Sequence, residues 1–177
     1  MSGAGKLLKL SDDQLAFLEA VPDDNPRFTE VLSIAMRDAE AKRDFKRHCS
    51  LTNRIVKKPE NRYHPEWNLE LGKCRLRNGD FEGAIDAIDR TLTESMGMSA
   101  STKVRRLLLA YEIAAVCRTR MYDSHAKANS GMGDDAMLNN AIAAWTSYRN
   151  YAAGVGNARA TQKAEREIAD LNVRKGG

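Results

Sequence analysis

The residue types that most often carry out catalysis are few in this chain of 177 residues, and they are widely spaced. The histidines are His48, His64 and His125, and none has a serine, cysteine or acid at the spacing of a known catalytic motif. The sequence also contains no HExxH, no glycine-rich phosphate loop and no paired-carboxylate motif. Because catalysis needs convergent titratable groups, we predict that the protein is not an enzyme, has no catalytic residues and uses no cofactor.

The cysteines are equally poor candidates for a metal site. Cys49, Cys74 and Cys117 form no CxxC pair and lie 25 and 43 residues apart. Structural zinc sites need closely spaced pairs of ligands, so this spacing argues against a bound metal ion. A buried position for each sulfur is the simpler interpretation, since cysteine packs as a small hydrophobe.

Basic side chains are concentrated in one segment. The formal charge of the chain is +4, and residues 37–62 alone hold nine Lys or Arg against four Asp or Glu, a local excess of five positive charges. On one helix, such cations could follow the phosphates of a nucleic acid or another anionic polymer. The interleaved acids favour a solvated helix face instead. The candidate contact residues in this segment are Lys42, Arg43, Lys46 and Arg47.

The aromatic residues form two groups. Those at helical spacing among Leu, Ile and Ala are predicted to form core between helices rather than a ligand box. They are Trp67, Tyr111, Trp145 and Tyr148. A second group falls near the expected helix ends, where partial exposure would allow contact with a partner. It consists of Tyr63, Tyr122 and Tyr151.

The elements that must position these residues are helices, because helical periodicity runs through most of the chain and no segment reads convincingly as a strand. Ser11 is a suitable N-cap for a short first helix, and residues 22–26, with two prolines, interrupt the chain after it. The apolar spacing from Arg27 to about Val56 predicts one long helix, with a kink or break near Ser50, where weak helix formers cluster. Further helices are expected at about 65–77, 81–94, 102–125, from Asp134 or Asp135 to before Gly154, and 158–174.

The composition is that of a soluble globular protein rich in helix formers, with 42% apolar and 29% charged residues. No apolar run approaches the roughly 20 residues needed to span a bilayer. The first ten residues contain Lys6 and Lys9 but no apolar stretch of signal-peptide length. The default expectation is a cytoplasmic protein, and the alternative of a soluble fragment from a longer anchored or exported protein stays open.

The stretch "GKCRLRNGDFEGAI", residues 72–85, predicts two helices that are joined by Asn-Gly-Asp and approach each other closely at small residues. The longer segment from Trp67 to Leu92 resembles a tetratricopeptide repeat. Leu71 and Gly72 match the Leu-Gly pair of that family, Gly79 matches its turn glycine, and Ala84 lies at the expected distance of twelve residues from Gly72. The segment departs from the family pattern at two positions. Trp67 is displaced by one residue, and Arg75 stands where a tyrosine is common.

A second, more degenerate copy is expected between residues 109 and 152, with either an extended first helix or an inserted loop. The final segment, "ATQKAEREIADL", resembles the capping helix that closes such arrays. Residues 1–59 show no repeat signature and are expected to pack on the repeat region over 60–177, forming one compact domain. The predicted fold is therefore an all-α, short tetratricopeptide-like solenoid of antiparallel helix pairs, with an extra long N-terminal helix and a capping helix.

The resemblance implies a non-catalytic scaffold whose concave helical face binds a segment of a partner protein. Lys73 and Arg75 are the candidate residues on that face. Some family members hold a partner's terminal carboxylate with an Asn after the Leu-Gly pair, but Lys73 occupies that place here, so this specific activity is not expected. The alternative function is binding of nucleic acid or another anionic polymer through residues 37–62.

Overall fold

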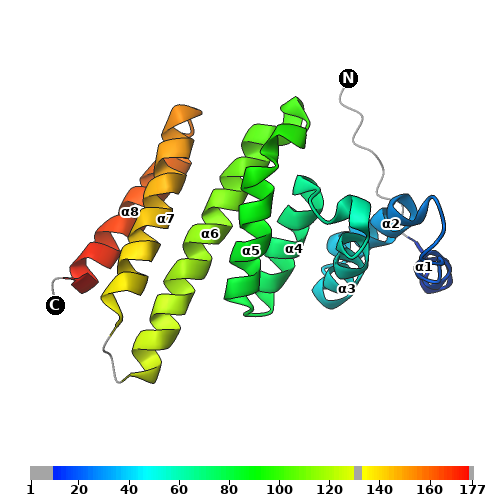
Figure 1. Cartoon of the computed structure of the whole chain (residues 1–177), viewed down its shortest axis with the longest axis horizontal. Helices are drawn as coiled ribbons and strands as arrows, with labels where there is room; N and C mark the ends of the chain where they lie inside the picture. Colours follow the sequence, from blue (N-terminus) through cyan, green and yellow to red (C-terminus); the bar gives the residue numbers. More distant parts are fainter. Residues whose placement is uncertain (1–9, 130–132, 176–177) are drawn as a thin grey trace. The chain divides into compact units, whose positions relative to one another are not determined.

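The computed structural model describes residues 10–129 and 133–175, and the regular structure in those ranges is helical throughout (Figure 1). The elements in chain order are α1 (Asp12–Glu19), α2 (Phe28–Ala41), α3 (Phe45–Val56), the 3-10 helix η1 (Pro59–Asn61), α4 (Pro65–Arg77), α5 (Phe81–Thr93), the 3-10 helix η2 (Ser95–Gly97), α6 (Ala100–Ala128), α7 (Asp135–Gly154) and α8 (Ala158–Lys175). The predicted all-α class is confirmed. The chain forms two compact units, the first ending at Arg62 and the second beginning at Tyr63. The packing of residues 1–59 on the rest of the chain stays a prediction.

In the first unit, one sequence-based expectation is wrong. The single long helix predicted over 27–56, with a break near Ser50, is instead two helices that end and begin at residues 42–44. Arg43 has a φ of 60°, in the left-handed region, which ends α2. The Asp44 carboxylate then accepts a hydrogen bond from the backbone N–H three residues later, at 3.0 Å, and caps α3. The break therefore lies where a cap is available, and Ser50 stays within α3.

The turn between α2 and α3 has the same hydrogen-bond pattern as two other helix–helix turns of the chain. At each one, the residue in the left-handed conformation donates its N–H to the carbonyl three residues earlier, and the next residue donates to the carbonyl five residues earlier. These paired bonds form a Schellman motif, and the side chain of the second residue caps the following helix. The turns contain Arg43-Asp44, Gly79-Asp80 and Gly156-Asn157. Residues 1–59, which carry no repeat signature, thus contain a helix hairpin closed like the one at Gly79.

Arg43 is the one of these turn residues that carries a side chain in a left-handed conformation, with a φ of 60° against 77° for Gly79. An L-residue pays about 1–2 kcal/mol there, whereas glycine does not. The greater entropy of glycine in the unfolded chain offsets part of this gain, so we expect Arg43→Gly to raise the free energy of unfolding by only roughly 0.5–1 kcal/mol. Gly79→Arg is expected to lower it by a similar amount. Urea denaturation of both variants checks this, and a destabilised Arg43→Gly protein would contradict the assigned turn.

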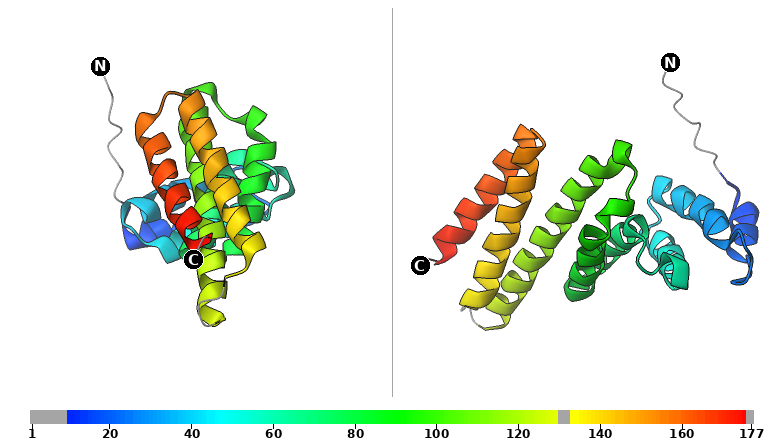
Figure 2. Two further views of the ribbon diagram at one scale, coloured as in Figure 1. Left: turned by 90° about the vertical axis from the view of Figure 1, so that its left-hand side faces the viewer. Right: turned by 45° about the horizontal axis from the view of Figure 1, so that its top comes forward.

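In the second unit, α6 is the central helix (Figure 2). Ion pairs join it to α4 on one side and to α8 on the other. They are Glu66–Arg106 between α4 and α6, and Glu112–Lys163 (2.5 Å) and Asp123–Arg174 (2.8 Å) between α6 and α8. Helix α5 packs against α4 and α6, and α7 packs against α6 and α8. Both α5 and α7 therefore pack on α6, and each packs more closely on α6 than on the other.

The close approach of α4 and α5 that the spacing of Gly72 and Ala84 predicts is confirmed. Gly72 is buried, and a Cβ atom built on it would lie 2.7 Å from Ile88 Cδ1. Ala84 is fully buried on the facing helix. Glycine at position 72 is thus needed because the side chain of Ile88 fills the space in front of its backbone.

The long α6 decides between the two alternatives for the second repeat-like segment. The helix has 29 residues and extends two residues before and three after the predicted range of 102–125, so the segment has an extended first helix. Residues 130–132 of the expected loop lie outside the described residues. Trp145 and Tyr148 are buried as predicted, whereas Trp67 and Tyr111 are half-buried. Tyr122 is 7% exposed, which corrects the expectation of partial exposure, because its ring packs in the core formed with α7 and α8.

Candidate functional site

The sequence-based candidates for chemistry do not form a reaction centre within the second unit. His64 precedes α4 and lies near Arg106, which together with burial, the larger cause, lowers the pKa of its imidazole. His125 lies in the last turn of α6, roughly 28 Å along that helix from Arg106 at 1.5 Å per residue. Burial raises the pKa of the Cys117 thiol to about 11, with Arg118 opposing and Asp80 adding to this shift. The thiol is therefore protonated at neutral pH and is a poor nucleophile.

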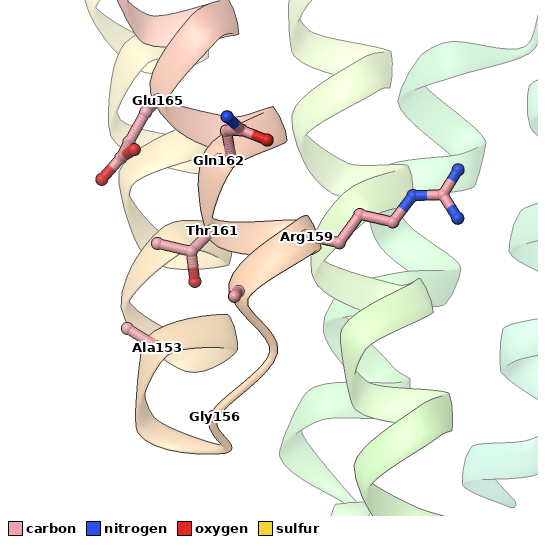
Figure 3. A pocket seen from close by; sticks show the side chains of 7 residues that line it. Ala153, Gly156, Arg159, Thr161, Gln162 and Glu165 are labelled. Atoms are coloured by element: carbon pink, nitrogen blue, oxygen red, sulfur yellow. The ribbon is translucent and has the colours of Figure 1, made fainter.

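A hollow of about 590 Å³ lies at the turn between α7 and α8 (Figure 3). The side chains of Arg159, Gln162 and Glu165 lie around it, on the first turns of α8. Figure 3 shows that Arg159 points toward α6, away from Glu165 and Thr161. Because these polar groups diverge, the hollow offers no convergent set of ligands.

The predicted contact residues of α4, Lys73 and Arg75, form ion pairs or hydrogen bonds within the second unit. Lys73 is largely buried and pairs with Glu70, one turn earlier, at 2.6 Å. Arg75 donates a hydrogen bond to the carbonyl of Gly83 at 2.7 Å and lies 3.6 Å from the Asp80 carboxylate. Arg75, at the position where the family commonly has tyrosine, thus braces the turn between α4 and α5. Both residues stay predicted contact residues.

The predicted contact residues of the basic segment fall into two groups in the first unit. Lys42 pairs with Asp38 at 2.9 Å and donates to the carbonyl of Leu10 at 2.9 Å. Arg47 pairs with Glu19 of α1. Arg43 and Lys46 are exposed. Part of the positive charge is therefore neutralised by the N-terminal segment of the same unit.

Two further cations, Arg54 of α3 and Lys58 after it, also bind the N-terminal segment of this unit. Arg54 donates to the carbonyl of Glu19 at 2.7 Å and to the carboxylate of Asp23 at 3.1 Å. Lys58 donates to the carbonyl of Asp23, and both cations lie over the ring of Phe28, at 5.2 and 4.7 Å from its centroid. The excess of cations in residues 37–62 thus holds α1 and the connection after it against the α2–α3 hairpin.

A continuous groove runs along α6 between α5 and α7. Adjoining hollows of about 340, 60 and 280 Å³ share lining residues, Met121 and Met137 at one junction and Arg118 and Asn140 at the other. We call this surface the α6 groove. It is lined by Ile85 and Leu92 of α5, Arg118 and Met121 of α6, and Met137 and Ala143 of α7. The groove lies over the side of α6 that faces α5 and α7, whereas the ion pairs of α6 join it to α4 and α8.

The sequence places these residues through ordinary helical spacing. Ile85 and Leu92 belong to the predicted apolar stripe of residues 81–94, but they are only half-buried, while Ala84 and Ile88 of the same stripe are buried. The α5 stripe is therefore wider than the surface that α4 and α6 cover. On α7, the small side chain of Ala143 leaves the edge of the groove open.

Arg118 is the groove residue that sequence reasoning missed. It is half-buried and lines two adjoining hollows near the middle of the groove. Across the residues that the structure describes, its guanidinium makes no hydrogen bond or ion pair. The available signal was its position on the stripe of Tyr111, Ala114 and Met121, where a cation interrupts an otherwise apolar face at helical spacing.

Comparison with known proteins leaves the family open. No protein-family model matches the chain, and no curated protein shows significant similarity to it. The tetratricopeptide resemblance of residues 67–92 accordingly stays a prediction. In residues 10–129 and 133–175, no helix has both the length and the apolar character needed to cross a bilayer.

Proposed function

We propose that this protein is a non-catalytic interaction module that binds a helical segment of a partner protein in the α6 groove. The observation that carries the proposal is the continuity of the groove, which has apolar side chains on all three helices and a half-buried Arg118 without a partner among the described residues. Apolar grooves with a few fixed polar groups are typical of peptide-binding surfaces. The tetratricopeptide resemblance supports the same class of function.

The dimensions of the groove favour a helix as the bound segment. From Tyr111 to Ser124, the groove residues of α6 span about 20 Å at 1.5 Å per residue, which corresponds to a helix of about 14 residues. Met121 and Met137 both line the junction of two hollows, and methionine side chains adapt to the shape of a bound apolar surface. The described part of the chain offers no strand edge to which an extended peptide could add.

The concave face that the family resemblance implies is a less suitable surface in this unit. Its helices would be α4, α6 and α8, whose charged side chains pair with one another between neighbouring helices. Binding there would require these ion pairs to be desolvated or broken. The α6 groove requires no such cost, since its apolar side chains are already partly exposed.

The alternative, a binder of anionic polymers, is less well supported by the geometry. Contacts with acidic groups or carbonyls of the N-terminal segment are made by Lys42, Arg47, Arg54 and Lys58. A cation that is already paired releases fewer counterions on binding a phosphate chain. Exposed Lys46 and its neighbours can still contribute to a salt-dependent association rate.

The experiment is affinity capture from a lysate of the native cell with the full chain as bait. Ala143→Arg places a large charged side chain at the exposed edge of the α6 groove, and we expect the captured protein to fall about tenfold or more. Ala153→Arg, at another exposed position of α7, is the matched control and should capture as the wild type does.

A third bait separates the two functions. The double variant Arg43→Gln, Lys46→Gln removes exposed charge but keeps Lys42, which pairs with the buried Asp38, and Arg47, which pairs with Glu19. We expect this bait to retain its partner at high salt and after nuclease treatment. If the double variant or nuclease abolishes capture while Ala143→Arg has no effect, the polymer-binding function is correct instead.

A further inference from the structure

The charges around the α6 groove are arranged asymmetrically. This arrangement indicates which side chains the bound segment carries. The inference rests on the proposed function. Arg118 lies on the floor of the groove with Ile85, Met121 and Met137 beside it. Asp89 lines the same hollow as Arg118 but is not within ion-pair distance of it. The guanidinium is thus available for a carboxylate that comes from outside.

A half-buried arginine in apolar surroundings binds a carboxylate more strongly than an exposed one does. The five N–H donors of its guanidinium match the two oxygens of a carboxylate, and the surrounding side chains exclude water once the groove is covered. An apolar group placed against Arg118 would instead leave a charge buried and unpaired. The position opposite Arg118 therefore selects Asp or Glu and rejects Leu or Lys.

The edge of the groove formed by α5 is acidic. Glu82 and Asp89 line the groove, and Asp86 lies between them at helical spacing. All three are exposed, and none forms an ion pair with another described residue. The opposite edge, formed by α7, carries neutral side chains such as Asn140 and Ser147. Basic side chains of a bound segment are therefore favoured on the side that faces α5 and not on the side that faces α7.

We infer that the partner of the α6 groove is an amphipathic helix whose apolar face contains a central Asp or Glu, paired with Arg118, and whose flank toward α5 carries Lys or Arg. The central carboxylate fixes the register of the helix, because only one position along the groove satisfies Arg118. The basic flank fixes its direction, because the two edges of the groove differ in charge.

The test uses a displayed library of amphipathic helices of about 14 residues, the length that the groove accommodates at 1.5 Å per residue. The central position of the apolar face and both flanks are randomised, and the bait is the full chain. We expect enrichment of Asp or Glu at the centre and of Lys or Arg on one flank.

Selected peptides are then measured by fluorescence anisotropy beside their Glu→Gln counterparts. With wild-type protein, the Glu peptide should bind about tenfold more tightly, the effect of one charge-assisted hydrogen-bonded pair. With Arg118→Gln this preference should fall below about twofold, whereas Arg120→Gln, an exposed arginine two residues further along α6, should preserve it.

The outcomes separate the inference from the proposed function. The inference is wrong, and the proposed function still holds, if Ala143→Arg weakens peptide binding but the peptides show no preference for a central acid. The same conclusion follows if Arg118→Gln leaves that preference intact. A selection that yields no peptide sensitive to Ala143→Arg overturns both. Dimerisation of the chain that Ala143→Arg abolishes would identify a second copy as the occupant, and it would also overturn the inference.

Discussion

Replacement of Trp145 with alanine is expected to lower the free energy of unfolding of the second unit by about 3–5 kcal/mol, the cost of removing a large aromatic side chain from a packed core. Trp145 lies on α7 and is only 2% exposed. Its Nε1–H donates to Thr119 Oγ1 of α6 at 2.9 Å, and its ring packs edge-on against Tyr148 at 5.7 Å between centroids. The substitution therefore removes contacts between helices and leaves the half-buried hydroxyl of Thr119 with one fewer partner.

The measurement is urea denaturation followed by far-ultraviolet circular dichroism. Trp67→Ala is the control, because Trp67, on the first turn of α4, is only half-buried. Its ring centroid lies 6.1 Å from that of His64. Trp67→Ala should cost clearly less than Trp145→Ala. Equal losses for the two variants would contradict the central place of Trp145 in the α6–α8 core.

The second large effect is expected at Gly72, where leucine should lower the free energy of unfolding by about 1–3 kcal/mol through overpacking. A Cβ atom at this position would lie 2.7 and 2.9 Å from the side chain of Ile88, and 3.5 Å from the carbonyl of Ala84. Ile88 is fully buried and has little room to move away. The helices α4 and α5 would have to separate to accommodate the new side chain.

Gly154→Leu is the matched control for this variant. Gly154 is the last residue of α7, its φ is ordinary, and a Cβ atom built on it meets nothing within 4 Å. The same chemical change should therefore leave stability unchanged or raise it slightly, since glycine is a poor helix former. Thermal denaturation of both variants checks the prediction. An unaltered melting temperature for Gly72→Leu would mean that the two helices are further apart than described.

The turns show how far local sequence signals reach. The turn at Gly79-Asp80 can be predicted from the sequence, because glycine marks a left-handed position and aspartate caps the next helix within the same few residues. The equivalent turn at Arg43-Asp44 cannot, because an arginine stands where glycine is usual and the helical spacing of apolar residues continues across the break. Periodicity alone cannot distinguish one long helix from two helices of a hairpin when both present apolar faces in phase.

The sequence by itself determined the helical class, most helix boundaries and the small residues at the α4–α5 contact, since these depend on hydrogen bonds and side chains a few positions apart. Only the tertiary structure decided which part of each apolar stripe is covered. Ile85 and Ala84 are neighbours in one stripe, yet one lines a groove and the other is fully buried. The same holds for Arg118, which lines a groove only because α5 and α7 both pack against α6. That placement results from the packing of helices distant in the chain, which no local pattern records.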